Sequence, residues 1–133
     1  MLNIAVLVSG GGTNLQALLD AQAAGTLKSG RITLVVSSKE GAYALTRAQN
    51  AGVETAVLAR ESGETPAAYG VGMVVLAGFM LILDACVIRA YEGRILNVHP
   101  SLIPAFCGEG YYGLRVHKAA LARGVKVTGA TVH

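Results

Sequence analysis

The sequence is poor in aromatic and in charged residues. Of its 133 residues, 5% are aromatic, none is tryptophan, and 14% are charged. Tyr111 and Tyr112 form the one aromatic pair, and no basic cluster accompanies them, which argues against a base-stacking surface for nucleic acid. The net charge of +3 comes from scattered residues rather than from a basic run. A small anionic ligand therefore suits the chain better than a nucleic acid does.

Cysteines and long apolar runs are also scarce. Cys86 and Cys107 lie far apart without Cys-x-x-Cys spacing, which argues against a metal knuckle or a redox pair and predicts two reduced thiols. The longest apolar run, residues 71–83, contains two glycines and is shorter than the roughly 20 residues of a membrane-spanning helix. No basic leader precedes the first apolar run, which argues against a signal or transit peptide and predicts a cytoplasmic location.

The sequence is rich in apolar residues, and short apolar runs typical of buried strands alternate with segments of helical periodicity. Its 53% hydrophobic content is enough for one buried core. This alternation predicts a single α/β domain with a mostly parallel twisted sheet flanked by helices, in which ligands bind at the carboxyl ends of the strands. Asp84 is the expected N-cap of the predicted helix 84–91, and the predicted strand 73–77 is expected to be buried on both faces. The predicted strands are 3–9, 32–37, 53–58, 73–77, 94–98 and 125–133, and the predicted helices are 14–24, 42–51, 84–91 and 117–123.

Three consecutive glycines, residues 10–12, join the first strand to the first helix, followed by Thr13 and Asn14. Backbone N–H groups and the helix dipole converge there on a point suited to a phosphate. The alternative is a plain tight turn in which Thr13 caps the helix. A dinucleotide fingerprint is disfavoured, since Leu15 stands where its third glycine belongs and residues 37–39 offer no carboxylate for a ribose. No Gly-Lys-Ser/Thr follows the glycines, so the P-loop pattern also fails.

Asn97 and His99 form a second polar pair at the end of a predicted strand. Strand alternation points both to one side. An amide can donate to a developing oxyanion, and an imidazole can move protons near neutral pH. The alternative is a polar strand end before Pro100 with no chemical role. His117 and His133 are interpreted as structural, because capping and backbone hydrogen bonds usually occupy histidines at the ends of elements.

Four segments together resemble a known family. They read VSGGGTNLQ at 8–16, VLAGFM at 75–80, NVHPSLIPAF at 97–106 and GVKVTGATVH at 124–133. In this order they resemble the phosphoribosylglycinamide formyltransferases of purine biosynthesis. The resemblance implies one Rossmann-like formyltransferase domain over residues 1–133, with the phosphate-binding half and part of the folate and catalytic half.

The resemblance also implies a site for two small molecules, without a metal, a nucleic acid or a membrane, in a monomer or homodimer. It assigns the catalytic chemistry to Asn97 and His99. The co-substrate is 10-formyltetrahydrofolate, and residues 80–83 would line its pterin pocket, although the sequence alone favours core packing for them. The implied ligand contacts are Gly12, Thr13 and Asn14 for the phosphate of glycinamide ribonucleotide, and Met80, Leu81, Ile82, Leu83 and Asn97 for the folate.

Other functions stay open at this point. A 10-formyltetrahydrofolate hydrolase would use Asn97 and His99 with water as acceptor, but the phosphate loop at 10–14 argues against it. Transfer to initiator methionyl-tRNA would want a basic second domain. A non-catalytic phosphate- or nucleotide-binding module, or a flavodoxin-like carrier, would use only the glycine loop. Formyl transfer requires that the loop and the imidazole of His99 open into one cleft along the same rim of the sheet.

The chain differs from the family in length. Members continue after Thr-Val-His with a loop whose aspartate partners the catalytic histidine, and neither Asp20 nor Asp84 fits that role. They also have roughly three more helical turns before the fourth strand, so residues 61–72 barely supply a parallel crossover. We expect further residues between Gly70 and Val71 and after His133, and a chain without them is expected to be a damaged enzyme.

Single positions near the folate pocket differ as well. Leu81 stands where the family usually has arginine, Cys107 stands where it has proline, and an arginine expected near Pro66 is absent. A hydrogen bond to a charged group contributes about 1.5–3 kcal/mol. These changes predict weaker affinity for the formyl donor without loss of binding.

Overall fold

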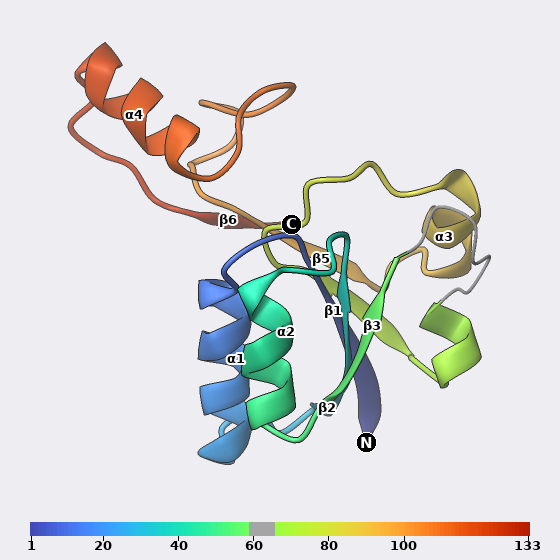
Figure 1. The fold of residues 1–133 in the computed structure, drawn as a ribbon. Helices are drawn as coiled ribbons and strands as arrows, with labels where there is room; N and C mark the ends of the chain where they lie inside the picture. The colour runs from blue at the N-terminus through green and yellow to red at the C-terminus, as the bar shows by residue number, and fades with distance from the viewer. Residues whose placement is uncertain (59–65) are drawn as a thin grey trace. The chain divides into compact units, whose positions relative to one another are not determined.

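The computed structural model describes residues 1–58 and 66–133 and divides the chain into two compact units, Met1–Ile95 and Leu96–His133 (Figure 1). The first unit alternates strands and helices, as expected. Its elements are β1 (Leu2–Val8), α1 (Thr13–Ala23), β2 (Gly30–Ser37), α2 (Tyr43–Asn50), β3 (Glu54–Val57), a 3₁₀ turn η1 (Pro66–Tyr69), β4 (Met73–Leu76) and α3 (Ala85–Ala90). The second unit contains β5 (Ile95–His99), α4 (Leu114–Arg123) and β6 (Thr131–Val132). The first residue of β5, Ile95, is the last residue of the first unit.

Four parallel strands of the first unit lie in the order β3-β2-β1-β4. Residues 4–8 of β1 are all buried, as in a parallel strand covered on both faces. Ile4, Val6 and Val8 pack with residues of α1 and α2, which lie side by side on one face (Figure 1). Ala5 and Leu7 pack on the other face with Val74 of β4 and with Tyr91, which follows α3. This arrangement confirms the predicted α/β fold.

A bulge in β2 lets both faces of that strand be apolar. Ile4 pairs with Ile32, but the next residue, Ala5, pairs with Leu34, so Thr33 is the extra residue. Ile32 therefore joins the core under the helices, while Leu34 joins the opposite core. The Thr33 hydroxyl is buried and has no hydrogen-bond partner in the described part of the chain.

The approach to β4 is held by polar contacts with β1 and Tyr91. Asn3 Nδ2 donates to the carbonyl of Gly70 at 3.1 Å, and the N–H of Gly72 donates to the carbonyl of Asn3 at 2.9 Å. The Tyr91 hydroxyl donates to the carbonyl of Val71 at 3.0 Å. The expected crossover, residues 61–72, lies partly outside the described residues, and its described part is η1 and the turn after it.

In the second unit, β5 and β6 pair antiparallel, with Val98 opposite Val132 and His99 opposite Thr131. Val116 and Ala120 of α4 are buried, and the helix ends at Gly124, whose φ of 79° suits a glycine. Among the described residues, no helix has the length and apolarity that crossing a membrane requires.

One expectation about a strand is wrong, and a second holds only in part. The predicted strand 125–133 is a strand only at Thr131–Val132. Val127 is 75% exposed, so its side chain does not pack against a neighbouring strand. The β propensity of this β-branched residue is therefore not enough to form a strand here. The predicted strand 73–77 ends at Leu76. Both faces of β4 pack against a core, Met73 and Val75 against one and Val74 and Leu76 against the other, but only Val74 is fully buried, so the predicted burial on both faces is only partial. The predicted helices are confirmed with shifted ends, the largest shift being the start of α4 at Leu114 instead of His117.

Candidate functional site

The pairing of β5 with β6 brings four polar side chains onto one face of the second unit. Asn97 and His133 exchange both backbone hydrogen bonds, at 2.7 and 3.0 Å, and His99 lies opposite Thr131. Directly opposed residues of an antiparallel pair point to the same side, as do residues two apart in one strand. Asn97, His99, Thr131 and His133 therefore share a face, and all four line one pocket.

His99 is oriented by a single backbone contact. Its Nε2 lies 2.9 Å from the carbonyl oxygen of Phe106. A carbonyl only accepts hydrogen bonds, so Nε2 carries the proton and the neutral ring has its lone pair on Nδ1. No described group occupies Nδ1, which makes it the atom that can exchange a proton with a ligand.

Asn97 contacts His133 side chain to side chain. Asn97 Nδ2 donates to Nε2 of His133 across 3.0 Å, which requires His133 to be neutral with its proton on Nδ1. One of the two Nδ2 hydrogens is thereby used. The second hydrogen and the Oδ1 atom have no partner in the described chain, so Asn97 can still donate one hydrogen bond to a ligand oxygen.

The loop after β5 is fixed by the hydroxyl groups of Ser101 and Thr131. Ser101 is fully buried, and its hydroxyl donates to the carbonyl of Ala105 at 2.6 Å. The Thr131 hydroxyl donates to the carbonyl of Ser101 at 2.6 Å and accepts from the N–H of Ile103 at 3.0 Å. These contacts hold the loop so that the Phe106 carbonyl, two positions after Pro104, meets the imidazole of His99.

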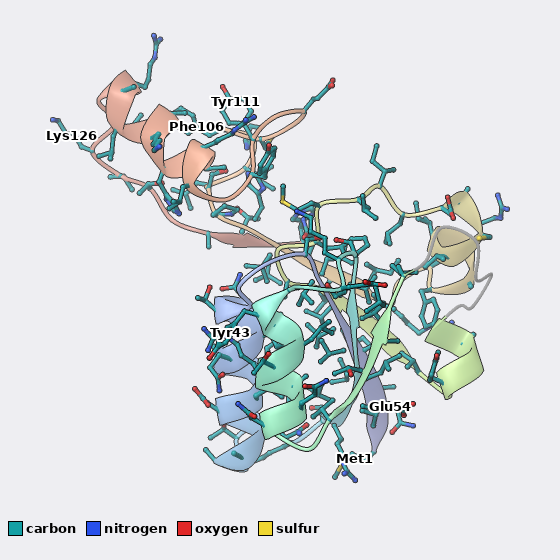
Figure 2. The ribbon with its side chains drawn as sticks, in the orientation of Figure 1. Met1, Tyr43, Glu54, Phe106, Tyr111 and Lys126 are labelled. Atoms are coloured by element: carbon teal, nitrogen blue, oxygen red, sulfur yellow. The ribbon has the colours of Figure 1, made fainter. Side chains whose placement is uncertain are left out.

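The pocket on this face measures about 520 Å³. Its walls beyond the four polar residues are largely apolar, and the Phe106 and Tyr111 rings lie 6.3 Å apart beside it (Figure 2). Cys107 carries a free thiol that donates to the carbonyl of Pro104. Within residues 1–58 and 66–133, no three His, Cys, Asp or Glu side chains gather as metal ligands would. The remaining lining residues are Ile103, Cys107, Gly108 and Tyr111.

The glycine-rich loop of the first unit opens α1. Gly12 is the N-cap, with φ 74° and ψ 36°, and a Cβ there would lie 2.6 Å from Cβ of Ala44. Only glycine fits this position. Thr13 is the first helical residue and Gly12 precedes it as the N-cap, so the cap assigned to Thr13 in the alternative of a plain tight turn is wrong. Thr13 and Asn14 are exposed at the positive end of the helix, and no acidic residue stands in its first turn.

The segment after β4 is exposed rather than packed in the core. Met80, Leu81 and Ile82 are 47%, 50% and 97% exposed, which contradicts core packing for these three, whereas Leu83 packs partly against the core. The buried Ser9 hydroxyl accepts the N–H of Met80 at 2.8 Å, tying this segment to the end of β1. Exposed apolar side chains beside a loop with free amide groups suit a partly apolar ligand.

His133 and Thr131 are the site residues that the sequence interpretation missed. Interpreting His133 as purely structural overlooked its contact with Asn97 and its place in the pocket wall. The sequence did contain a signal for them. Thr131 and His133 are two residues apart, like Asn97 and His99, so in a strand each pair would point to one side of the sheet. The side chain of His117 is exposed and makes no hydrogen bond or ion pair in the described structure, which agrees with leaving it out.

Comparison with known proteins gives a consistent result. The sequence matches the family described as "Formyl transferase" over residues 2–133. It is 40% identical to phosphoribosylglycinamide formyltransferase of Escherichia coli K12 over 99% of this chain and 65% of that protein, and 37% identical to the chloroplastic enzyme of Vigna unguiculata over 98% and 45%. The chain thus spans less than two thirds of these relatives.

Solved structures agree in fold. Glycinamide ribonucleotide transformylase 1 of Symbiobacterium toebii matches with a TM-score of 0.86 and 42% identity, covering 100% of this chain and 65% of that one. The corresponding protein of Geobacillus kaustophilus matches with a TM-score of 0.86 and 35% identity, covering 100% and 73%. The α/β fold, the glycine loop, the polar pocket and these similarities together place the chain in the formyl transferase family.

Proposed function

We propose that the protein transfers the formyl group of 10-formyltetrahydrofolate to the amine of glycinamide ribonucleotide, in the cytoplasm. The observation that carries the proposal is the shared face of β5 and β6, where Asn97 and His99 line one pocket. Relatives that bear this activity in their names support the choice of substrates. The substrates are small molecules, and the protein acts as a monomer or homodimer.

In this reaction the amine nitrogen bonds to the formyl carbon, and the bond from that carbon to N10 of the folate breaks. The amine loses a proton and N10 gains one. Negative charge develops on the formyl oxygen, where the second Nδ2 hydrogen of Asn97 is a neutral donor that does not titrate. Nδ1 of His99 exchanges the proton, because Nε2 is committed to the Phe106 carbonyl.

Residues outside this pair bind and orient the substrates in the proposal. The amide groups around Gly12, Thr13 and Asn14 hold the phosphate of the ribonucleotide. Met80 to Leu83, together with Asn97, contact the folate, for which exposed apolar side chains are suited. Exclusion of water by the apolar part of the pocket wall, Ile103 and Tyr111, favours transfer over hydrolysis of the formyl donor.

The test is tetrahydrofolate release by the purified protein from 10-formyltetrahydrofolate, with and without glycinamide ribonucleotide. Formyl transfer predicts release only when the amine is present. Equal release without the amine identifies a hydrolase, and no release under either condition means that the chain does not transfer the formyl group. Either of these two results refutes the proposal.

A further inference from the structure

Arg47 of α2 contacts the glycine-rich loop directly. Its Nε donates to the carbonyl of Gly11 at 2.7 Å, and its Nη1 donates to Oε1 of Gln16 on α1 at 3.0 Å. The guanidinium carbon lies 4.9 Å from the ring centre of Tyr43, an exposed residue at the start of α2. Three separate contacts therefore fix the side chain between α1, α2 and the loop.

These contacts set the direction of the loop amides. The N–H of Ala44 donates to the carbonyl of Gly10 at 3.1 Å, so the carbonyls of Gly10 and Gly11 both point toward α2. In a trans peptide, the C=O of one residue and the N–H of the next point in opposite directions. The N–H groups of Gly11 and Gly12 must then point away from α2. Neither has a hydrogen-bond partner among the described residues.

The charge of Arg47 is not neutralised locally. No carboxylate in the described part of the chain pairs with it, and its two hydrogen-bond acceptors are neutral oxygens. The first turn of α1 contains no acidic residue either. The guanidinium charge therefore adds to the positive end of the α1 dipole at the loop.

We propose that Arg47 is a positioning residue for the phosphate of the substrate. By holding the Gly11 carbonyl, it keeps the N–H of Gly12, one of the amides proposed to hold the phosphate, directed away from α2 and free for an anion. The proposal rests on the proposed function, because it requires a phosphate ligand at the loop. A positioning role differs from a purely structural role in one respect. Loss of the Arg47 side chain should weaken binding only of ligands that carry the phosphate.

The experiment compares Arg47→Ala and Arg47→Lys with Arg31→Ala, which removes an equal charge from an exposed side chain that makes no hydrogen bond or ion pair in the described structure. The probes are glycinamide ribonucleotide and glycinamide riboside, which lacks the phosphate. Dissociation constants are measured by calorimetry, and kcat and KM are measured by formyl transfer. Circular dichroism checks the fold of each variant.

For Arg47→Ala we expect both the dissociation constant and the KM for the ribonucleotide to rise about ten- to hundredfold, as for a lost hydrogen bond of a charged group. The values for the riboside, and the KM for the formyl donor, should change less than about twofold on the same scale. Arg47→Lys should recover only part of the affinity, because an ammonium cannot reproduce the fixed fork of the guanidinium. Arg31→Ala should match the wild type.

Three results overturn the inference while leaving the proposed function intact. These are unchanged ribonucleotide affinity in Arg47→Ala, an equal loss for the riboside, and full recovery by Arg47→Lys. Should Arg47→Ala not fold, Gln16→Ala is the second variant. It removes the acceptor of Arg47 on α1 together with the exposed hydrogen bond from Gln16 to Asp20, and it must weaken ribonucleotide binding and spare the riboside, or the inference fails. A wild-type protein that does not prefer the ribonucleotide to the riboside overturns the proposed function and the inference together.

Discussion

At the scale of single residues, one hydrogen bond each determines what His99 and Asn97 can offer a ligand. The Phe106 carbonyl accepts a hydrogen bond from Nε2 of His99, which places the ring proton on that atom. Nε2 of His133 accepts a hydrogen bond from one of the two amide N–H groups of Asn97. What remains available is Nδ1 of His99 together with one amide N–H and the Oδ1 atom of Asn97. A proton-transfer group and an oxyanion donor are the two functions that acyl transfer to an amine requires.

His99→Ala should reduce kcat about 10²- to 10⁴-fold, because the variant loses its proton-transfer group. Affinity for glycinamide ribonucleotide, measured by calorimetry, should stay nearly unchanged. His117→Ala is the matched control, since the His117 side chain is exposed and makes no hydrogen bond or ion pair in the described structure, and it should retain wild-type turnover. An equal loss of turnover and of ribonucleotide affinity in His99→Ala would argue against the role assigned to His99.

Tyr91 makes stability depend on pH in the alkaline range. Burial raises the pKa of its hydroxyl above the usual 10.0, and the nearby Arg94 opposes part of that increase. The folded state therefore favours the protonated phenol. Its contribution to stability is complete below the unfolded-state pKa and is lost as the pH rises through the higher folded-state pKa.

Tyr91→Phe should lower the free energy of unfolding near neutral pH by about 1–2 kcal/mol, because the Val71 carbonyl loses its donor. It should also flatten the fall in stability above pH 10. Urea unfolding between pH 8 and about 11 measures both effects. Tyr43→Phe is the control, since Tyr43 is exposed. A variant whose stability falls as steeply as the wild type above pH 10 would refute this contribution of Tyr91.

The site was only partly predictable at the residue scale. Asn97 and His99 were found because their spacing is local in the sequence. The contact between Asn97 and His133 spans 36 positions and exists only because β6 pairs with β5 in one particular register. Alternation within one strand says nothing about its partner strand, so this contact could not be derived from local patterns.

At the scale of elements, the loop before α1 depends on close packing with α2. The positive φ of Gly12 and its approach to Ala44 fix the start of α1, from which Thr13 and Asn14 project. Three glycines in a row suggested such an approach, but not which of them makes it. Gly10 and Gly11 would both accept a Cβ without any atom within 4 Å.

Gly12→Ala should therefore reduce the free energy of unfolding by about 2 kcal/mol or more, since left-handed backbone costs a non-glycine residue about 1–2 kcal/mol and overpacking adds about 1–3. Gly11→Ala is the matched control and should lose less than about 1 kcal/mol on the same scale. Denaturant unfolding of both variants decides the matter. Equal destabilisation would show that the contact with Ala44 does not constrain the loop.

Helices with a clear apolar periodicity could be predicted from the sequence. Strands and bulges that depend on pairing with another strand could not. Leu15 and Leu19, one helical turn apart, are both buried, and α1 was found within one residue at each end. Val125 and Val127 are exposed, and their β propensity predicted a strand that the chain does not form there. The bulge at Thr33 also left no local sign, because it is defined by the register with β1.

At the scale of the whole molecule, membership of the formyl transferase family rests on a match over residues 2–133 and on solved structures with TM-scores of 0.86. The chain nevertheless spans 65% of the Escherichia coli relative and 45% of the Vigna unguiculata relative. Fold and family follow from the shared part. The reaction, the substrates and the roles of Asn97, His99 and Arg47 are proposals for this chain.

The most direct measurement follows an isotope-labelled formyl group from 10-formyltetrahydrofolate in the presence of glycinamide ribonucleotide. Formyl transfer predicts that the label appears on the ribonucleotide amine in an amount equal to the tetrahydrofolate formed. Label recovered as free formate, with the ribonucleotide unmodified, would contradict formyl transfer.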